Sequence, residues 1–278
     1  MKCKNSYSFV VRVFPCVYNR YKGVNIGMII DILNEVLNST DSHTTMYYFC
    51  DFIKTHIHDI SHITIEEVAK DCFTSKGQIS KCAKRLGFAS YLEFKDACID
   101  YSHSLLVKPV FFSKEDDLPQ NNKTFAEHVS KTIGYVSEHI NYAVLNRLIN
   151  DILGSRIVYL YAQGDNRSLC NVIQVELSAL YVSVVICDAD FIKEYQFNDE
   201  DVLIILSTNA TIFNLNKRII SRLLKANVKT WLVTCNTKME FPKNTLCVPS
   251  YHDKYNKFAI RHVVDIIIAS IQLMQKKK

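Results

Sequence analysis

Residues 64–88 read TIEEVAKDCFTSKGQISKCAKRLGF, and this stretch contains two short amphipathic helical patterns separated by a tight break. In each pattern apolar side chains recur every three or four residues, which places them on one face of a helix. They are Ile65, Val68, Ala69 and Cys72 in the first pattern, and Ile79, Cys82, Ala83 and Leu86 in the second. The stretch therefore predicts two short helices with apolar inner faces.

Capping signals mark the ends of these helices. Thr64 followed by Glu67 is a capping-box pattern, in which the two residues satisfy backbone N–H groups at a helix start. Ser75 and Gln78 repeat the pattern before the second helix. Gly87 stands where a helix C-terminus favours a left-handed residue. The two helices are thus expected to begin after Thr64 and Ser75, and the second to end near Gly87.

The outer face of the second helix is basic and carries an amide. It bears Lys76, Gln78, Lys81, Lys84 and Arg85, and no acidic residue occurs between Lys76 and Phe88. Two helices with packed inner faces and such an outer face favour a helix-turn-helix whose second helix enters the major groove of DNA. A plain helical hairpin is the alternative that the pattern leaves open.

The longer run ITIEEVAKDCFTSKGQISKCAKRLGFASYLEFK resembles the N-terminal domain of the RpiR/MurR family of bacterial transcriptional regulators. The resemblance extends from about Met28 to Ser102, and it includes the Leu86-Gly87-Phe88 element and the helix that follows it. Two positions depart from the family pattern. Gly77 costs about 1 kcal/mol relative to Ala inside a helix, and Lys81 stands where an Arg is usual, which gives up bidentate geometry.

The resemblance and the helical pattern together imply a role for each polar residue of this stretch. Ser75 would cap the recognition helix. Lys76, Gln78 and Lys81 would face base edges, where Gln can pair with adenine through two hydrogen bonds. Lys84, Arg85 and Tyr91 would hold phosphates. Double-stranded DNA is the expected partner.

Composition indicates a soluble protein with two ordinary domains. The chain has 278 residues, 48% of them hydrophobic and 22% charged, and its net charge of +5 is a weak hint of nucleic-acid binding. Ten cysteines without regular spacing indicate reduced thiols in a cytoplasmic protein. His56, His58 and His62 lack neighbouring ligands at metal-binding spacing, and no apolar run reaches the length of a membrane span. We therefore expect no metal site and no membrane partner.

The chain divides into four segments. Residues 1–27 are an N-terminal extension of unknown role, and residues 28–105 are the all-α helix-turn-helix domain, with further helices expected at 27–37, 45–57 and 90–102. Residues 106–123 contain two prolines, acidic residues and amides, a composition typical of a linker. The second domain covers residues 124–278 and opens with one long helical pattern over 124–153.

The rest of the second domain predicts an α/β fold. Five short β-rich runs occur at residues 156–161, 182–187, 201–207, 228–234 and 245–249, and helical stretches separate most of them. Near-continuous apolar strands alternating with helices indicate a parallel sheet with both faces covered by helices.

Two loops at expected strand ends are rich in polar residues. The first covers residues 162–168 and the second residues 207–211. In parallel sheets ligands bind beyond the carboxyl ends of the strands, where backbone N–H groups, hydroxyls and helix dipoles suit an anion such as phosphate. Capping alone could also explain either loop.

Residues from about Phe125 to Leu273 resemble a SIS (sugar isomerase) domain, which accompanies the helix-turn-helix in RpiR-type regulators. The resemblance implies dimerisation and binding of a phosphosugar effector. The implied effector-binding residues are Gly164, Asn166, Arg167, Ser168, Ser207, Thr208, Asn209 and Thr211. Two residues depart from the family's phosphate loops: Asp165 would repel a phosphate, and Ala210 replaces a glycine.

The sequence thus predicts a DNA-binding transcriptional regulator, of carbohydrate metabolism, that forms a homodimer or higher homo-oligomer and binds a phosphosugar or related anion. A regulator whose SIS-like domain only dimerises is the first alternative. The second is a sugar-phosphate isomerase, for which Asp165 and Asp188 are the carboxylates at plausible strand ends. We expect no catalytic residues and no cofactor.

Overall fold

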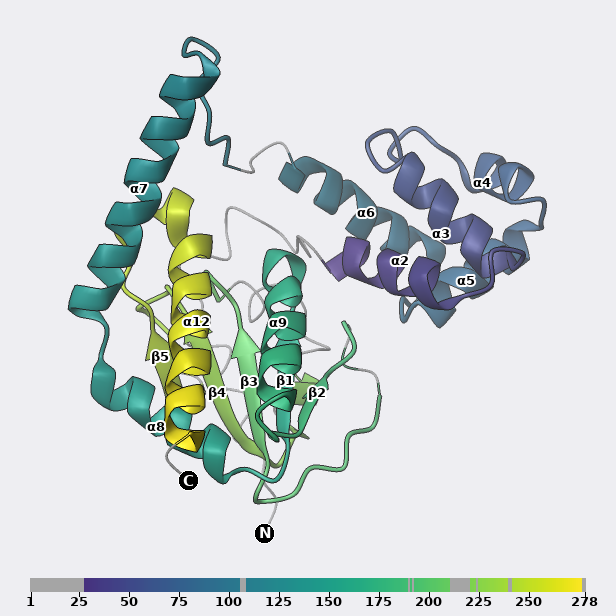
Figure 1. Cartoon of the computed structure of the whole chain (residues 1–278). Helices are drawn as coiled ribbons and strands as arrows, with labels where there is room; N and C mark the ends of the chain where they lie inside the picture. The colour runs from purple at the N-terminus through teal and green to yellow at the C-terminus, as the bar shows by residue number, and fades with distance from the viewer. Residues whose placement is uncertain are drawn as a thin grey trace.

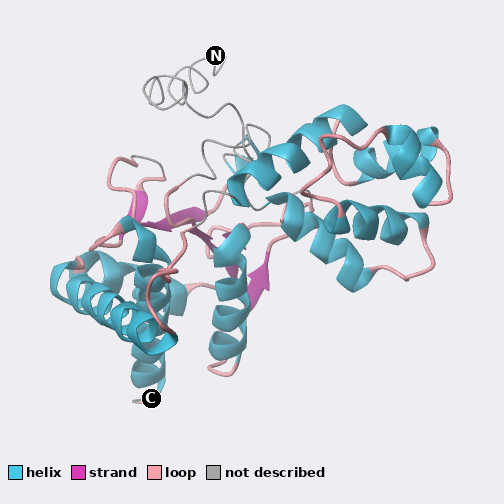
Figure 2. Cartoon of the chain, turned by 90° about the horizontal axis from the view of Figure 1, so that it is seen from above, coloured by secondary structure: helices cyan, strands magenta, loops and turns pink. Residues whose placement is uncertain are grey.

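A computed structural model describes residues 28–105, 109–189, 191, 193–210, 221–223, 225–239 and 242–276. The N-terminal extension and Thr211 lie outside the described residues. Within them the chain forms a helical domain beside a domain built on a parallel sheet, and Figures 1 and 2 show the two side by side.

The helical domain contains five described helices, whose inner residues are those that the sequence pattern selects. They are α2 (Met28–Ser39), α3 (Thr45–Thr55), α4 (Ile65–Asp71), α5 (Lys76–Arg85) and α6 (Tyr91–Leu105). Phe94 of α6 lies at the centre, with its ring centroid 5.1 Å from Phe49 and 5.3 Å from Phe88. Ile79 and Cys82 of α5 are buried against this core. The expected all-α domain is therefore confirmed.

The cap of α4 agrees with the sequence in full, whereas at α5 only the Ser75 half of the expected capping box forms. Thr64 and Glu67 form the complete capping box at the start of α4. At the start of α5 the Ser75 hydroxyl accepts a hydrogen bond from the Gln78 backbone N–H at 3.3 Å. Gly87 has a φ of 91°, the left-handed conformation that ends a helix at low strain for glycine alone.

The second domain begins with two helices and not the single long helix that its apolar pattern suggests. They are α7 (Leu118–His139) and α8 (Tyr142–Gly154). Ile140 is extended, with a ψ of 141°, and the Asn141 side chain caps α8 by accepting from the N–H groups of Ala143 and Val144. The helix α7 also starts within the segment expected to be a linker, because Asp117 caps it and Pro119 fits its first turn.

All five expected strands are present and form one parallel sheet. The remaining elements are β1 (Val158–Ala162), η1 (Gly164–Asn166), α9 (Arg167–Ser178), β2 (Val184–Ile186), β3 (Val202–Leu206), β4 (Lys229–Thr234), β5 (Asn244–Cys247), η2 (Asp253–Tyr255) and α12 (Asn256–Gln275). The strand order is β2-β1-β3-β4-β5, and every pairing is parallel. The expected α/β class of the second domain is confirmed.

Both faces of the sheet are buried. Alternate strand residues such as Leu160 and Ile204 pack with the apolar sides of α8, α9 and α12 (Figure 1). The opposite face presents Tyr161 and Leu203, which join a core containing Phe191 and the helical residue Leu223. A sheet enclosed on both sides explains why its strands are continuous apolar runs.

The strand order fixes where a ligand site can form. The chain passes from β1 to the edge strand β2 and then returns to the other side of β1 with β3. In open parallel sheets this reversal leaves a crevice at the carboxyl ends of the two central strands. The two polar loops chosen from the sequence follow β1 and β3, so both lie at this point.

Helix α12 is long and apolar enough, by length and composition, to cross a membrane. Its apolar side is buried against the second domain, however, and it contacts α7, α8 and α9. Lys257, Arg261 and Asp265 occupy its exposed side. This two-sided pattern is that of a helix that packs its apolar side into the core of its own domain.

Candidate DNA-binding face and anion-binding loops

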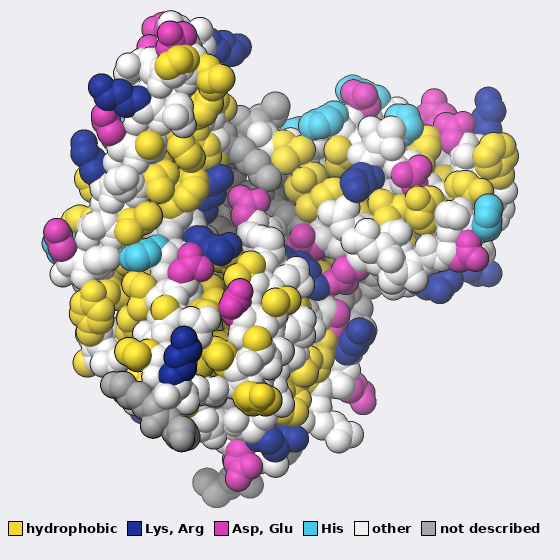
Figure 3. All heavy atoms as spheres, viewed as in Figure 1, with side chains coloured by type: hydrophobic (Ala, Val, Ile, Leu, Met, Phe, Trp, Pro, Cys, Tyr) yellow, Lys and Arg dark blue, Asp and Glu magenta, His cyan; other side chains and the backbone are white. Residues whose placement is uncertain are grey.

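The basic face of α5 is exposed. The side chains of Lys76, Lys81, Lys84 and Arg85 are exposed, while Gln78 is partly buried. The contacts of α5 are with α3, α4 and α6, which lie behind it. Figure 3 shows Lys and Arg side chains gathered at the edge of the helical domain that α5 occupies in Figure 1. This face has the exposure that a helix needs to enter a DNA groove.

Lys76 has a partner within the helical domain. Its Nζ atom lies 2.6 Å from Oε1 of Glu66 on α4, and both side chains are largely exposed. The hydrogen bond from Lys76 lowers the pKa of the Glu66 carboxyl. The carboxylate therefore pairs with a lysine that the sequence analysis expects to face DNA.

Tyr91 does not lie where the sequence argument placed it. Its hydroxyl oxygen is buried without a hydrogen-bond partner among the described residues, and burial raises its pKa to about 12. The ring is 6.3 Å from Phe94 and packs on the domain core. The neighbouring Lys95 donates to the Ile63 carbonyl at 2.7 Å. The phosphate contact expected of Tyr91 is therefore inconsistent with this position, and the residue is part of the hydrophobic core.

The two polar loops of the second domain lie next to each other. Nδ2 of Asn166 donates to Oγ1 of Thr208 at 3.0 Å, which joins the loop after β1 to the loop after β3. Both loops are held to the sheet, because the backbone N–H of Ser207 donates to the Val233 carbonyl and the Thr208 carbonyl accepts from Cys235. The crevice thus brings together residues of both loops.

Other expected effector residues make local contacts in these loops. Oγ of Ser168 donates to the Asp165 carbonyl at 3.0 Å. The carbonyl of Asn209 accepts from Nδ2 of Asn236 at 3.1 Å, which adds the loop after β4 to the same end of the sheet. Ser207 is buried, with 6% of its surface exposed.

Two groups suited to an anion are bound by acidic side chains of the helical domain. The backbone N–H of Gly164 donates to Oδ2 of Asp31 at 2.7 Å. The guanidinium of Arg167 pairs with the Glu35 carboxylate, and its other nitrogen donates to the Cys187 carbonyl at 3.1 Å. Asp31 and Glu35 are one helical turn apart on α2. Two carboxylates of α2 therefore bind the loop that follows β1.

Burial changes the acidity of Asp31. Desolvation raises its pKa to about 6, although the hydrogen bond from Gly164 and the charge of Arg167 act in the opposite direction. The nearby carboxylates of Glu35 and Asp165 add to the rise. Asp31 is thus held in its charged form at a cost near neutral pH.

The loop after β3 is strained at Ala210, the position where the resemblance to a SIS domain implies a glycine. Ala210 has a φ of 55°, a left-handed conformation that residues with a Cβ atom adopt at a cost of about 1 kcal/mol or more. The backbone N–H of Ala210 donates to the Ser207 carbonyl, which closes the turn. The loop keeps a glycine-like shape without the glycine.

Sequence reasoning missed Asp31 and Glu35. The signal that could have drawn attention to them is local: they are the acidic residues of α2, and Ile29, Ile32 and Leu33 occupy the buried side of the same helix. No pattern in the sequence, however, connects α2 with a loop more than a hundred positions later.

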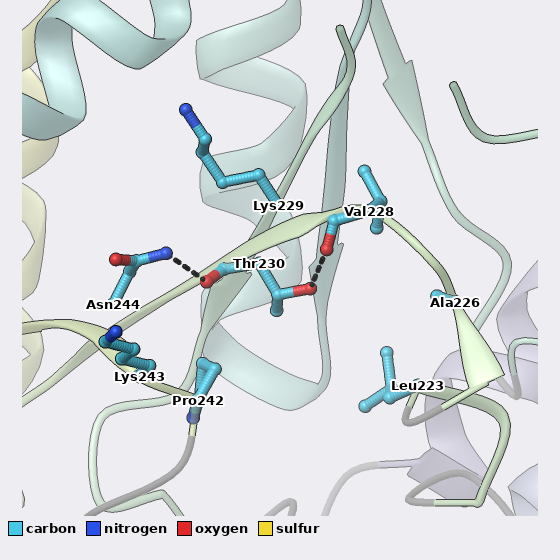
Figure 4. A pocket seen from close by; sticks show the side chains of 8 residues that line it. All are labelled: Leu223, Ala226, Val228, Lys229, Thr230, Pro242, Lys243 and Asn244. Carbon is cyan, nitrogen blue, oxygen red and sulfur yellow. Dashed lines mark hydrogen bonds between the residues drawn. The ribbon is translucent and has the colours of Figure 1, made fainter. Parts of the chain in front are cut away.

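A cavity of about 280 Å³ lies at the other end of the sheet. Figure 4 shows it at the amino ends of β4 and β5, with Asn244 bound to the Thr230 carbonyl and the Thr230 hydroxyl bound to the Val228 carbonyl. It is lined by Leu223, Ala226, Val228, Lys229, Thr230, Pro242, Lys243 and Asn244. Because it is distant from the carboxyl ends of the strands, it does not belong to the crevice.

The described residues hold no group of three potential metal ligands and no disulfide. Burial raises the pKa of thiols such as Cys50 and Cys170, both to about 12, so they remain protonated near neutral pH. Among the carboxylates weighed for catalysis, Asp188 accepts from the hydroxyl of Tyr195 and from the backbone N–H of Lys193.

Comparison with known proteins bears on the helical domain most directly. Residues 29–104 match the model of the rpiR-family helix-turn-helix domain. The HTH-type transcriptional regulator GlvR of Bacillus subtilis is 24% identical over 134 residues, which are 48% of this chain and 45% of GlvR. The chain therefore spans less than half the length of this curated relative.

Solved structures resemble the chain at low identity. The NanR protein of Vibrio vulnificus, solved with ManNAc-6P, has a TM-score of 0.43 and 13% identity, with coverage of 88% of this chain and 90% of NanR. The sugar isomerase domain of an RpiR transcription factor from Sphaerobacter thermophilus has a TM-score of 0.45 and 11% identity, with coverage of 58% of this chain and 93% of that domain.

Proposed function

Because residues 29–104 form a helix-turn-helix domain of the rpiR family, we propose that the protein is a transcriptional regulator that binds double-stranded DNA through α5. The observation that carries this proposal is the exposed basic face of α5, held by the Ser75 cap and by its buried inner residues. Lys76, Gln78 and Lys81 face base edges, and Lys84 and Arg85 contact phosphates.

The SIS-like second domain senses a phosphosugar or a related anion in this proposal. Support comes from the two polar loops at the topological switch point, from the Asn166–Thr208 hydrogen bond that joins them, and from the Gly164 N–H and the Arg167 guanidinium, which already hold carboxylates. A sugar phosphate offers negatively charged oxygens that can accept from the same donors. The regulated genes belong to carbohydrate metabolism, and the protein works in the cytoplasm.

Self-association belongs to the same proposal. A helix-turn-helix commonly binds a two-fold symmetric DNA site as a dimer. Exposed apolar residues occur just before α7 and at its first residue, among them Val110, Phe112 and Leu118, and Figure 3 shows hydrophobic side chains along α7. Light scattering of the purified chain tests this point, with a dimer or larger oligomer as the expected result and a monomer at all concentrations as the contrary one.

Catalysis has less support. Isomerisation of a sugar phosphate needs a base beside the substrate carbon, and Asp188 is engaged by Tyr195 in a loop separate from Asp165. We therefore infer a binding domain and no enzyme. A domain that only dimerises remains the alternative, and it predicts that no sugar phosphate binds.

The experiment that tests DNA binding is selection of preferred sequences from a random duplex pool, followed by fluorescence anisotropy with the selected duplex. Gln78→Ala is expected to relax sequence preference, at about 1–3 kcal/mol for one lost base contact. Lys84→Ala is expected to weaken binding to all sequences alike. Lys131→Ala, on the exposed side of α7, is the control. Unchanged binding by both α5 variants contradicts the proposed placement of the helix.

Effector binding is tested by thermal unfolding against hexose, hexosamine and pentose phosphates, including ManNAc-6P. A ligand that binds only the folded state adds about 2.7 kcal/mol at 100 times its Kd. We expect one selective shift in Tm that is lost in the Ser168→Ala and Ser207→Ala double variant. No shift with any member of the panel favours the dimerisation-only alternative.

A further inference from the structure

Helix α2 joins the two domains at the loop where an anion is expected. It packs on α3 and α6 within the helical domain through Ile29, Ile32 and Leu33, and it contacts η1 of the second domain with its other side. Two polar links lie at this contact: Asp31 accepts from the Gly164 N–H of η1, and Glu35 pairs with Arg167 at the start of α9. Apolar residues of both domains also belong to one buried cluster. Helix α2 is thus packed into the core of the helical domain and is also bonded to the sheet domain.

The two carboxylates make the contacts that a phosphate group makes. A phosphate at the start of a helix accepts from backbone N–H groups and pairs with an arginine. At the start of α9, Asp31 accepts from the Gly164 N–H and Glu35 pairs with Arg167. The arginine side chain is only 18% exposed, so it has little room for a second anion while Glu35 remains in place. Two negative ligands cannot occupy these groups at once without strong repulsion.

From this juxtaposition we propose that α2 is an internal competitor of the effector: an anion that binds the loop after β1 displaces Asp31 and Glu35 and releases the DNA-binding domain from the sheet domain. The inference rests on the proposed sensing function and specifies how it is regulated. Because α2 is packed into the helical domain, its displacement moves the whole domain, including α5. The effector is a small phosphorylated anion, and its binding is coupled to the release of α2 from the loop after β1.

The docked state leaves the basic face of α5 exposed, since α5 contacts only helices of its own domain among the pairs with several contacts. In this proposal the effector changes the position and orientation of α5 and leaves the exposure of its basic face unchanged. In a dimer formed through the sheet domains, docking fixes the distance between two recognition helices, and release removes that constraint. The internal ligand is also weak, because burial raises the pKa of Asp31 and opposes its charged form.

The test compares the full chain with a double variant, Asp31→Ala with Glu35→Gln. The matched control is Glu176→Gln, which alters an exposed carboxylate elsewhere on α9. Probes are inorganic phosphate, glucose 6-phosphate, glucosamine 6-phosphate and ribose 5-phosphate. Calorimetry measures the affinity of each probe, and hydrogen exchange measures protection of residues 28–39 and 162–168.

The proposal expects the double variant to bind the effective probe about tenfold more tightly, the gain that follows if about nine-tenths of the unliganded chains are docked. Exchange of residues 28–39 is expected to rise in the double variant, and in the unaltered chain when the probe is added. Arg167→Ala should lose binding in both backgrounds. The control should behave as the unaltered chain does.

Equal or weaker affinity in the double variant overturns the inference, because α2 is then not a competitor. The absence of binding by every probe to both proteins overturns it as well, because the loop is then not an anion site. If instead the DNA-binding proposal is wrong, DNA binding is unchanged when α5 itself is altered. The probe affinities measured by calorimetry do not depend on that result. The two results can therefore be separated.

Discussion

At the scale of single residues, the Lys76–Glu66 pair lies within the surface of α5 that is proposed to contact DNA. The two side chains are 60% and 58% exposed, so the pair adds little to stability. Its effect on binding is larger, since Glu66 places a negative charge beside the surface proposed to face phosphates. The pair is thus a restraint on affinity that the sequence pattern of α5 alone does not reveal.

Glu66→Gln is expected to raise DNA affinity about two- to fivefold at low salt, because it frees Lys76 and removes a charge that repels phosphates. Unfolding free energy should change by less than about 0.5 kcal/mol. Anisotropy titration with the selected duplex and a denaturant melt measure the two quantities. Glu127→Gln on α7 is the control, and a loss of affinity in Glu66→Gln contradicts the account.

Asp31 gives the protein a specific pH dependence. Its folded-state pKa of about 6 lies above the ordinary 3.8, so the folded chain binds a proton more tightly than the unfolded chain does. Stability from this group is therefore greatest at low pH, falls as the pH rises from about 4 to about 6, and is constant above that. The groups that face Asp31 are Gly164 N–H, Arg167, Glu35, Asp165 and the hydroxyl of Tyr101.

The difference in unfolding free energy between the unaltered chain and Asp31→Asn isolates this effect. We expect that difference to favour the unaltered chain by about 1 kcal/mol more at about pH 5 than at about pH 7. Denaturant unfolding at the two pH values measures it. A difference that is independent of pH shows that Asp31 is not held in a desolvating contact.

Residue positions were predictable from the sequence where periodicity determines them. The buried residues Ile79 and Cys82 and the exposed residues Lys81 and Lys84 follow from one helical repeat. Tyr91 did not follow, because a tyrosine at a helix start can point to solvent or to a core, and the packing of Phe94 decides between them. The partners of Asp31 and Glu35 depend on how two domains meet, which no local pattern encodes.

At the scale of elements, the break between α7 and α8 shows how an apolar repeat can mislead. Val136, Ile140 and Val144 keep a spacing of four residues across the break, so the repeat suggests one continuous helix. Ile140 is nevertheless extended, and Asn141 caps the new helix with two hydrogen bonds. The break leaves backbone N–H groups free at the start of α8, and the Asn141 side chain satisfies two of them, which lowers the cost of the break.

The turn after β3 offers a test at the same scale. Ala210→Gly is expected to raise the unfolding free energy by up to about 1 kcal/mol, because glycine removes the strain of a positive φ while losing part of that gain to chain entropy. A denaturant melt measures the change. Ala162→Gly, at an extended strand position, is the control and should lower stability. Destabilisation by Ala210→Gly contradicts the strained turn.

At the scale of the whole molecule, the sequence predicted two domains, the all-α and α/β classes and all five strands. The strands could be predicted from the sequence because both faces of the sheet are buried, which makes strands such as β1 and β3 continuously apolar. The arrangement of the two domains relative to each other could not be predicted from the sequence. It involves the side chains of Asp31, Glu35 and Arg167 and the backbone N–H of Gly164, together with an apolar cluster to which both domains contribute, and these groups lie far apart in the sequence.

If the basic face of α5 binds DNA, the affinity must fall with salt concentration in proportion to the number of phosphate contacts. Each phosphate contact that is lost reduces the slope of log K against log salt by about 1. The measurement compares the unaltered chain, the Lys81→Ala, Lys84→Ala and Arg85→Ala triple variant, and Lys131→Ala, between about 50 and 200 mM salt. A slope reduced by about 2 is expected in the triple variant, because the phosphate contacts of Lys84 and Arg85 are lost, and an unchanged slope is expected in Lys131→Ala. Identical slopes in all three proteins would contradict DNA binding through this face.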